Sequence, residues 1–126
     1  MAHVETTLAV MNSIIFVGDR GAEPPLHLDG IIGIQKSCIA IGTRIEIDGE
    51  THIQLFDGGL PEDVVSGLML IASEILEIPS GEIAVETADA ETLLSCRVRD
   101  LRVRCNIFVN NDKWPDEIVI GVEPAE

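Results

Sequence analysis

The fold prediction starts from residues 38–56, CIAIGTRIEIDGETHIQLF. Aliphatic or β-branched side chains occupy every second position of its first half, at Ile39, Ile41, Thr43, Ile45 and Ile47. Because successive side chains point to opposite faces of a strand, this period of two predicts a half-buried strand with one aliphatic face. Asp48-Gly49 has turn chemistry, and a second alternating run follows it, so the whole stretch predicts a β-hairpin.

The hydrophobic pattern also sets the expected register of this hairpin. A three-residue loop, 48–50, pairs Ile47 with Thr51 and Ile45 with Ile53, which keeps the aliphatic side chains on one face. A two-residue loop would break that face. Since register follows the buried face, we expect the three-residue loop.

Further strands are expected along the rest of the chain, at 13–17, at 75–87 as a second hairpin that turns at 79–82, at 101–109 and at 117–122. Turn residues or polar clusters bound most of these runs, as is typical of strands. The apolar phase slips by one position between Cys96 and Leu101. The slip indicates either a tight turn at Arg99-Asp100 or a β-bulge.

Residues 61–75 are consistent with two structures. Pro61 and the acidic pair after it suit the first turn of a helix, but Gly67 would cost that helix about 1 kcal/mol relative to Ala. A strand at 68–72 is the alternative, and we favour it. With the other runs, this predicts a mainly β fold: one antiparallel β-sandwich domain over residues 1–126, with about seven or eight short strands and at most one short helix near 61–75.

The charge is strongly negative and is spread along the chain. There are 22 Asp and Glu against 8 Lys and Arg, a net charge of −14. Residues 1–63 hold 10 acidic and 3 basic residues and residues 64–126 hold 12 and 5, so each half carries −7. Such a field repels phosphate backbones and anionic lipid surfaces, so we expect neither nucleic acid nor membrane as a partner. The 46% hydrophobic content argues against disorder.

No pattern in the sequence predicts catalysis, a metal site or a cofactor. The three cysteines show no CxxC spacing, no histidine pair has ligand spacing, and neither a nucleophile elbow nor a phosphate-binding loop occurs. The odd cysteine number and an N-terminus unlike a secretory signal predict a reducing, cytoplasmic location. We therefore expect a protein that is not an enzyme.

Candidate partner-binding residues come from three features of the sequence, and they are Glu46, Asp48, Glu50, Arg102, Arg104 and Trp114. The three carboxylates would step by roughly 6.6–6.8 Å in an extended strand, close to the spacing of phosphates, although the turn at 48–49 would interrupt the row. The two arginines share a strand face within a cluster of four at 97–104, where they could bind carboxylates or pair with neighbouring ones. Trp114, in a polar loop, is either a cap on the core edge or an interface anchor.

Two segments resemble a known family. The stretch EPPLHLD, 23–29, resembles the entry to the first hairpin of the competence-protein-J family, and GLMLIASEILEIPSGEIAV, 67–85, resembles that family's strand, turn and returning strand. The resemblance spans about residues 14–87 and leaves out the arginine cluster and Trp114. It implies a β-sandwich that inhibits a DNA-entry nuclease by direct binding, but it fixes no interface residue.

Three functional hypotheses follow. The first is a non-catalytic acidic protein that docks on a basic protein partner, a nuclease or a toxin, which it would inhibit. The second is a structural or self-assembling β protein, a homo-oligomer joined through its strand edges. The third is a small enzyme or ligand-binding domain with a pocket among Cys38, His52 and the arginines.

Overall fold

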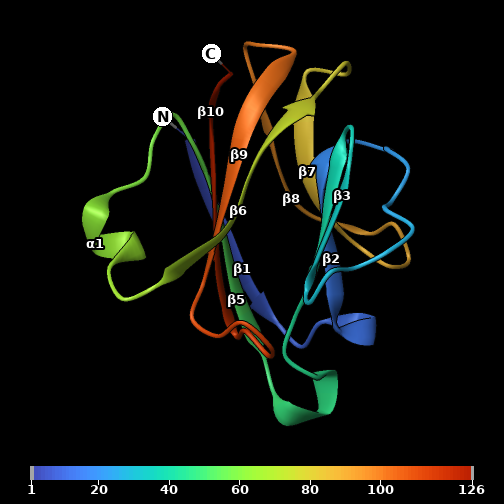
Figure 1. Cartoon of the computed structure of the whole chain (residues 1–126), viewed down its shortest axis with the longest axis vertical. Coiled ribbons are helices and arrows are strands. Elements are labelled where there is room, and N and C mark those ends of the chain that lie inside the picture. The colour runs from blue at the N-terminus through green and yellow to red at the C-terminus, as the bar shows by residue number, and fades with distance from the viewer. Residues whose placement is uncertain (1, 126) are drawn as a thin grey trace.

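The computed structural model describes residues 2–125, and over these residues ten strands form two five-stranded sheets that pack face to face (Figure 1). The strand order is β1-β5-β10-β9-β6 in the first sheet and β3-β4-β2-β7-β8 in the second. The strands are β1 (Ala2–Leu8), β2 (Ile14–Asp19), β3 (Ile32–Gln35), β4 (Cys38–Gly42), β5 (Thr51–Asp57), β6 (Met69–Glu77), β7 (Glu82–Thr87), β8 (Thr92–Arg97), β9 (Arg102–Val109) and β10 (Glu117–Pro124). The short helical turns are η1 (Met11–Ser13), η2 (Glu46–Asp48) and α1 (Glu62–Val65).

The core lies between the two sheets and is almost entirely aliphatic. The strand β9 buries every second residue, and β10 is buried along most of its length because it is central in its sheet. Ile53, Ile107 and Ile120 of the first sheet face Ile15 and Ile39 of the second within one buried cluster. Burial of such side chains is the main stabilising contribution to a fold of this kind.

The prediction of a mainly β, sandwich-like fold is confirmed, but its strand count and its purely antiparallel character were wrong. The described chain has ten strands rather than seven or eight. One of the additional strands is β1, which was not predicted from the sequence. The strands β5 and β10 run parallel, with Ile53 beside Ile118, so the first sheet is mixed.

The hairpin predicted at 38–56 does not form. After Gly42 the chain leaves the second sheet, passes through η2 and enters the first sheet as β5, so the two halves of the stretch belong to different sheets. Ile53 pairs with Thr6 of β1 and with Ile118 rather than with Ile45, and Ile47 is 91% exposed. The turn at Gly49, whose φ is 134°, belongs to a connection between the sheets. Alternation correctly identified the buried side chains of β4 and β5, but it wrongly assigned Ile45 and Ile47 to the buried face and did not identify the partner of either strand.

The hairpin predicted at 75–87 is wrong for the same reason. The turn itself is present, since the Gly81 N–H donates to the carbonyl of Ile78 at 3.0 Å with Gly81 at a φ of 76°. It joins β6 of the first sheet to β7 of the second, and these strands pair with β9 and with β2 and β8.

The two ambiguous segments are both resolved. The phase slip between Cys96 and Leu101 is not a β-bulge, because β8 and β9 lie in different sheets. The chain bends at residues 99–101, as the alternative of a tight turn at Arg99-Asp100 expected, and this bend joins the two sheets. At 61–75 the favoured strand is confirmed as β6, preceded by the single helical turn α1. Gly67, at a φ of 82°, separates the two.

Candidate protein-binding surface

One end of the sandwich carries four of the six predicted site residues. Glu46 and Asp48 lie in η2, and Glu50 lies just before β5. The loop after β9, which carries Trp114, lies at the same end (Figure 1). The backbone N–H of Arg44 donates to the carbonyl of Pro115 at 2.8 Å, which fastens the two segments together.

Side chains fasten this end as well. The guanidinium of Arg44 is 3.3 Å from a carboxylate oxygen of Asp116, and the backbone N–H of His52 donates to the Asp116 carbonyl at 2.8 Å. Asn111 accepts hydrogen bonds from the backbone N–H groups of Lys113 and Trp114 at 2.8 and 2.9 Å. The loop that carries Trp114 is therefore held in one conformation by its own polar groups.

Exposed apolar side chains share this end with the carboxylates. Ile47 is 91% exposed, Trp114 is 56% exposed and Met11, in η1 packed against η2, is also exposed. We call this surface the acidic end and define it by Met11, Ile45, Glu46, Ile47, Asp48, Glu50 and Trp114. Met11 and Ile47 were not predicted as site residues, because the alternating pattern assigned Ile47 to the core and nothing in the sequence singled out Met11.

The carboxylates do not form an extended row. Because Glu46 and Asp48 lie in one turn of 3-10 helix, they cannot keep the spacing of alternate strand residues. Their side chains are exposed. The acidic end therefore supplies negative charge around apolar side chains rather than a regular imitation of a phosphate chain.

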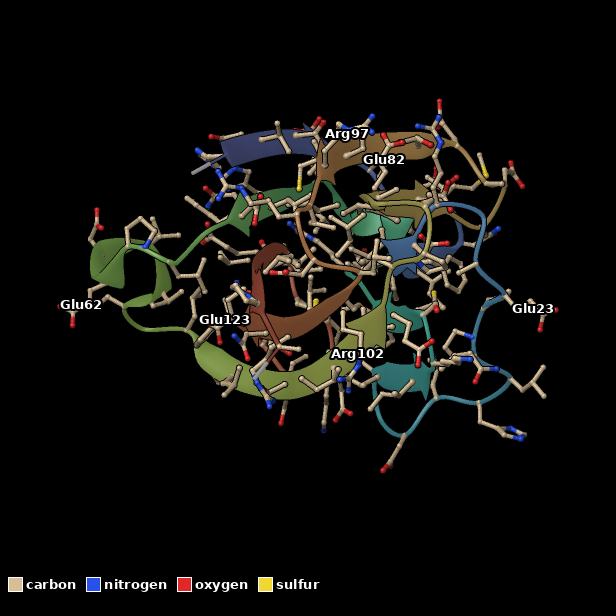
Figure 2. The ribbon with its side chains drawn as sticks, turned by 90° about the horizontal axis from the view of Figure 1, so that it is seen from above. Glu23, Glu62, Glu82, Arg97, Arg102 and Glu123 are labelled. Atoms are coloured by element: carbon tan, nitrogen blue, oxygen red, sulfur yellow. The ribbon has the colours of Figure 1, made fainter. Side chains whose placement is uncertain are left out.

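Arg102 and Arg104 lie away from the acidic end, on β9 of the first sheet. Arg102 is the register partner of Glu77, and the Arg104 guanidinium donates to the hydroxyl of Ser73 at 3.2 Å. The four-arginine cluster is also divided, since Arg97 lies on β8 of the second sheet beside Glu82 (Figure 2). Within residues 2–125, no carboxylate lies within 4 Å of any of the four guanidinium groups.

The pocket predicted among Cys38, His52 and the arginines does not exist. Cys38 alternates with the core residue Ile39 and so lies on the outer face of the second sheet. His52 alternates with Ile53 and lies on the outer face of the first sheet. The two side chains are on opposite sides of the molecule, so no pocket can include both.

A network of polar side-chain contacts crosses the outer face of the first sheet. Nε2 of His52 is 2.7 Å from a carboxylate oxygen of Glu5, and its Nδ1 is 3.3 Å from one of Glu117. Partial burial would lower the pKa of His52, but hydrogen bonds and charge from the two carboxylates outweigh it and raise that pKa. The arrangement links β1, β5 and β10 through side chains.

The three cysteine thiols are all shielded from water to some extent, and this affects their ionisation. Burial raises the pKa of Cys38 and Cys96 to about 11 and that of Cys105 to about 12, so all three are protonated at neutral pH. Over the described part of the chain, no group of three or more His, Cys, Asp or Glu is placed to hold a metal ion. Among the described helices, none has the length and hydropathy needed to cross a membrane.

The fold is similar to one seen in a solved structure. It matches the crystal structure of ComJ, inhibitor of the DNA degrading activity of NucA, from Bacillus subtilis, with a TM-score of 0.70 and 10% sequence identity. The match covers 97% of this chain and 96% of ComJ, so it includes the C-terminal part that the sequence resemblance left out. The resemblance to the competence-protein-J family is thus confirmed at the level of the fold. No protein-family model matches the sequence, and no curated protein sequence does.

Proposed function

We propose that this chain is a non-catalytic protein that binds a basic protein partner, a nuclease, and inhibits it. The whole-length likeness to ComJ carries this proposal, because ComJ is an inhibitor of a DNA-degrading enzyme. The net charge of −14 supports a partner of opposite charge. A nuclease presents positive charge to the phosphates of its substrate, so the same surface attracts an acidic protein.

The acidic end is the proposed contact surface. Trp114 and Ile47 supply the large exposed apolar side chains that anchor protein interfaces, and Glu46, Asp48 and Glu50 surround them with negative charge. The carboxylates would speed the encounter, and the apolar anchors would slow dissociation. Arg102 and Arg104 face elsewhere and stay outside this contact.

We also place the chain in the cytoplasm. All three cysteines are free thiols, and two of them are buried. A reducing compartment keeps such thiols unpaired.

Retention of a nuclease from the host's own lysate tests the proposal. The immobilised chain is expected to retain a basic protein with DNA-degrading activity at low salt and to release it as the salt concentration rises. Adding the free chain to the eluted protein should suppress DNA degradation at equimolar amounts. The proposal fails if the retained fraction contains no such activity, or if the activity persists with excess chain.

Matched variants locate the surface. Trp114→Ala and Ile47→Lys are each expected to weaken binding at least ten-fold, since truncation of a central anchor costs about 2 kcal/mol or more. Leu101→Ala and Leu101→Lys are the controls, because Leu101 is exposed and lies just before β9, at the end of that strand opposite to the loop that carries Trp114. Equal affinity of the Trp114 and Leu101 variants would exclude the acidic end as the contact.

Self-assembly is the alternative function and stays a prediction. The strands β3 and β6 are sheet edges, which can pair with a second copy. Analytical ultracentrifugation separates the two functions, because a monomer at high micromolar concentration excludes self-assembly.

A further inference from the structure

The two flanks of the sandwich differ. On one flank the edge strands β1 and β8 pack against each other and close the gap between the sheets. On the other flank the edge strands are β6 and β3, which are linked where β6 ends and the turn after β3 begins. There the Glu77 N–H donates to the carbonyl of Lys36 at 3.1 Å, and the two side chains form an ion pair at 3.4 Å.

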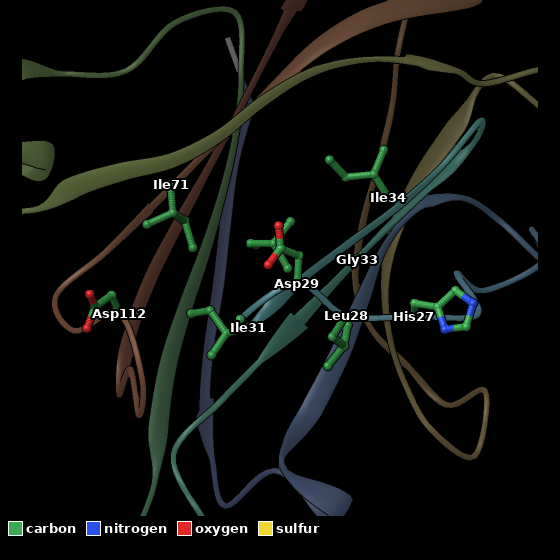
Figure 3. A pocket seen from close by; sticks show the side chains of 10 residues that line it. His27, Leu28, Asp29, Ile31, Gly33, Ile34, Ile71 and Asp112 are labelled. Atoms are coloured by element: carbon green, nitrogen blue, oxygen red, sulfur yellow. The ribbon is translucent and has the colours of Figure 1, made fainter.

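Away from this meeting point a groove opens between β3 and β6. Its volume is about 550 Å³. Figure 3 shows Ile71 of β6 and Asp112 on one side of it and Ile31 and Ile34 on the other. Most of its lining side chains are aliphatic, and Ile34 is 50% exposed. The groove is thus open to solvent rather than a closed cavity, and it is bounded by residues 27–34 on one side and by Ile71 and Asp112 on the other.

Backbone groups along this flank are unpaired. Among the described residues, the backbone of β6 forms hydrogen bonds with β9 along one edge. Along its other edge, only the N–H of Glu77 forms a backbone hydrogen bond. Ile32 of β3 exchanges hydrogen bonds with Asp29, so its N–H and C=O point away from β4. Ile34, two residues further on, points its own N–H and C=O the same way, where no described backbone group meets them.

The charge of the groove determines what fits it. Asp29 and Asp112 lie in its lining, neither forms an ion pair with a described residue, and no Lys or Arg lines it. A second copy of this chain would also be acidic, with a net charge of −14 spread along its sequence. Like charge therefore opposes self-pairing here, and a basic segment is favoured.

We propose that the groove between β3 and β6 binds an extended segment of a partner protein in which apolar and basic side chains alternate. The segment pairs with the free edge of β6 through its backbone and extends the first sheet. Its apolar side chains lie against Ile31, Ile34 and Ile71, and its basic side chains approach Asp29 and Asp112. The bound strand closes the open flank as β1 and β8 close the other. This site is separate from the acidic end.

Synthetic peptides test the site without any knowledge of the partner. The probe is an eight-residue peptide of alternating Val and Lys, with a Val-Glu peptide and a block peptide of four Lys and four Val as controls. Amide chemical shifts and hydrogen exchange of the full chain are followed as each peptide is added. The Val-Lys peptide should shift and protect the amides of 70–75 and of Ile34, and it should bind at least ten-fold more tightly than either control. Equal binding of the block peptide, or shifts confined to the acidic end, would overturn the proposal.

Charge-matched variants exclude general attraction to an acidic protein. Ile34→Lys and Leu101→Lys add the same charge at exposed positions, so both should fold, but only Ile34→Lys should weaken the Val-Lys peptide ten-fold or more. Asp112→Asn should weaken it several-fold and reduce its salt dependence. Equal effects of the two lysine variants would overturn the site. Detection by sedimentation of a dimer that Ile34→Lys dissociates would also overturn the proposal, because the occupant of the groove would then be a second copy of the chain. Because no nuclease takes part, these results are independent of the proposed inhibition.

Discussion

Replacement of Thr51 by Val should stabilise the protein. Thr51 opens β5 and is fully buried, and its hydroxyl oxygen has no hydrogen-bond partner among the described residues. A buried polar group left without a partner costs about 1–3 kcal/mol, and Val has nearly the same shape and a strong strand preference. We therefore expect Thr51→Val to raise the free energy of unfolding by about 1–2 kcal/mol.

Thr43 provides the matched control. It is as buried as Thr51, but its hydroxyl donates to the carbonyl of Arg44 at 3.2 Å. Thr43→Val removes a satisfied hydrogen bond and should be neutral or destabilising by about 1 kcal/mol.

Thermal and urea unfolding measure both changes. For a chain of this length, 1 kcal/mol corresponds to roughly 4 °C in Tm, so Thr51→Val should melt about 4–8 °C higher. The urea midpoint should rise with an unchanged m value. Loss of stability in Thr51→Val, or an equal gain in Thr43→Val, would refute the assignment of an unpartnered hydroxyl.

Three further predictions concern pH, packing and thiol reactivity. Because Glu5 and Glu117 raise the pKa of His52 in the folded state, their contribution is complete below the ordinary histidine pKa of about 6.5 and is lost as the pH rises through the raised value. Urea unfolding of wild type should show this loss above pH 6.5, and His52→Gln should remove it; an unchanged profile in the variant contradicts the linkage. A Cβ at Gly18 would overlap the carbonyl oxygen of Ser37, so Gly18→Ala should destabilise the fold by about 3 kcal/mol in the same assay, and a stable variant would exclude this close approach. Since Cys38 and Cys105 are buried and burial raises the pKa of both thiols, iodoacetamide at pH 8 should modify these two cysteines only in denaturant, as mass spectrometry would show; rapid labelling of either one in the native chain would contradict its burial.

Local sequence identified most strands but not how they associate. The alternation at 101–109 predicted β9 well, because β9 buries every second residue. The pattern at 117–122 predicted the strand β10 but not that both faces of β10 are buried. Alternation reports which side of a strand is buried, and in a sandwich that side faces the opposite sheet whichever strand is its neighbour. The sequence predicted the turns at Gly49 and Gly81 because glycine readily adopts the positive φ that these turns have. Such a turn can join two strands of one hairpin or two strands of different sheets, so it did not identify the strand pairing.

The functional surfaces depended even more on tertiary structure. Trp114 was found because one large aromatic residue in a polar loop is unusual in this chain. The β3–β6 groove left no signal, since Ile34 and Ile71 are ordinary strand residues whose exposure depends on where the two sheet edges diverge. The strand β1 did have a signal, with Val4, Thr6 and Leu8 alternating with exposed residues, but its weak aliphatic content concealed it.

Ile47 is where local pattern and final structure disagree most. It continues the alternation of β4 at the periodic position, yet the chain has already left the sheet and the side chain is 91% exposed. An isoleucine side chain that is exposed to water contributes almost nothing to the stability of the fold. Conflicts between local sequence pattern and structure tend to occur at functional positions. Stability and binding are therefore separable at Ile47. Replacing it should leave the unfolding free energy within about 0.5 kcal/mol of wild type, so any loss of partner affinity there reports on the interface alone.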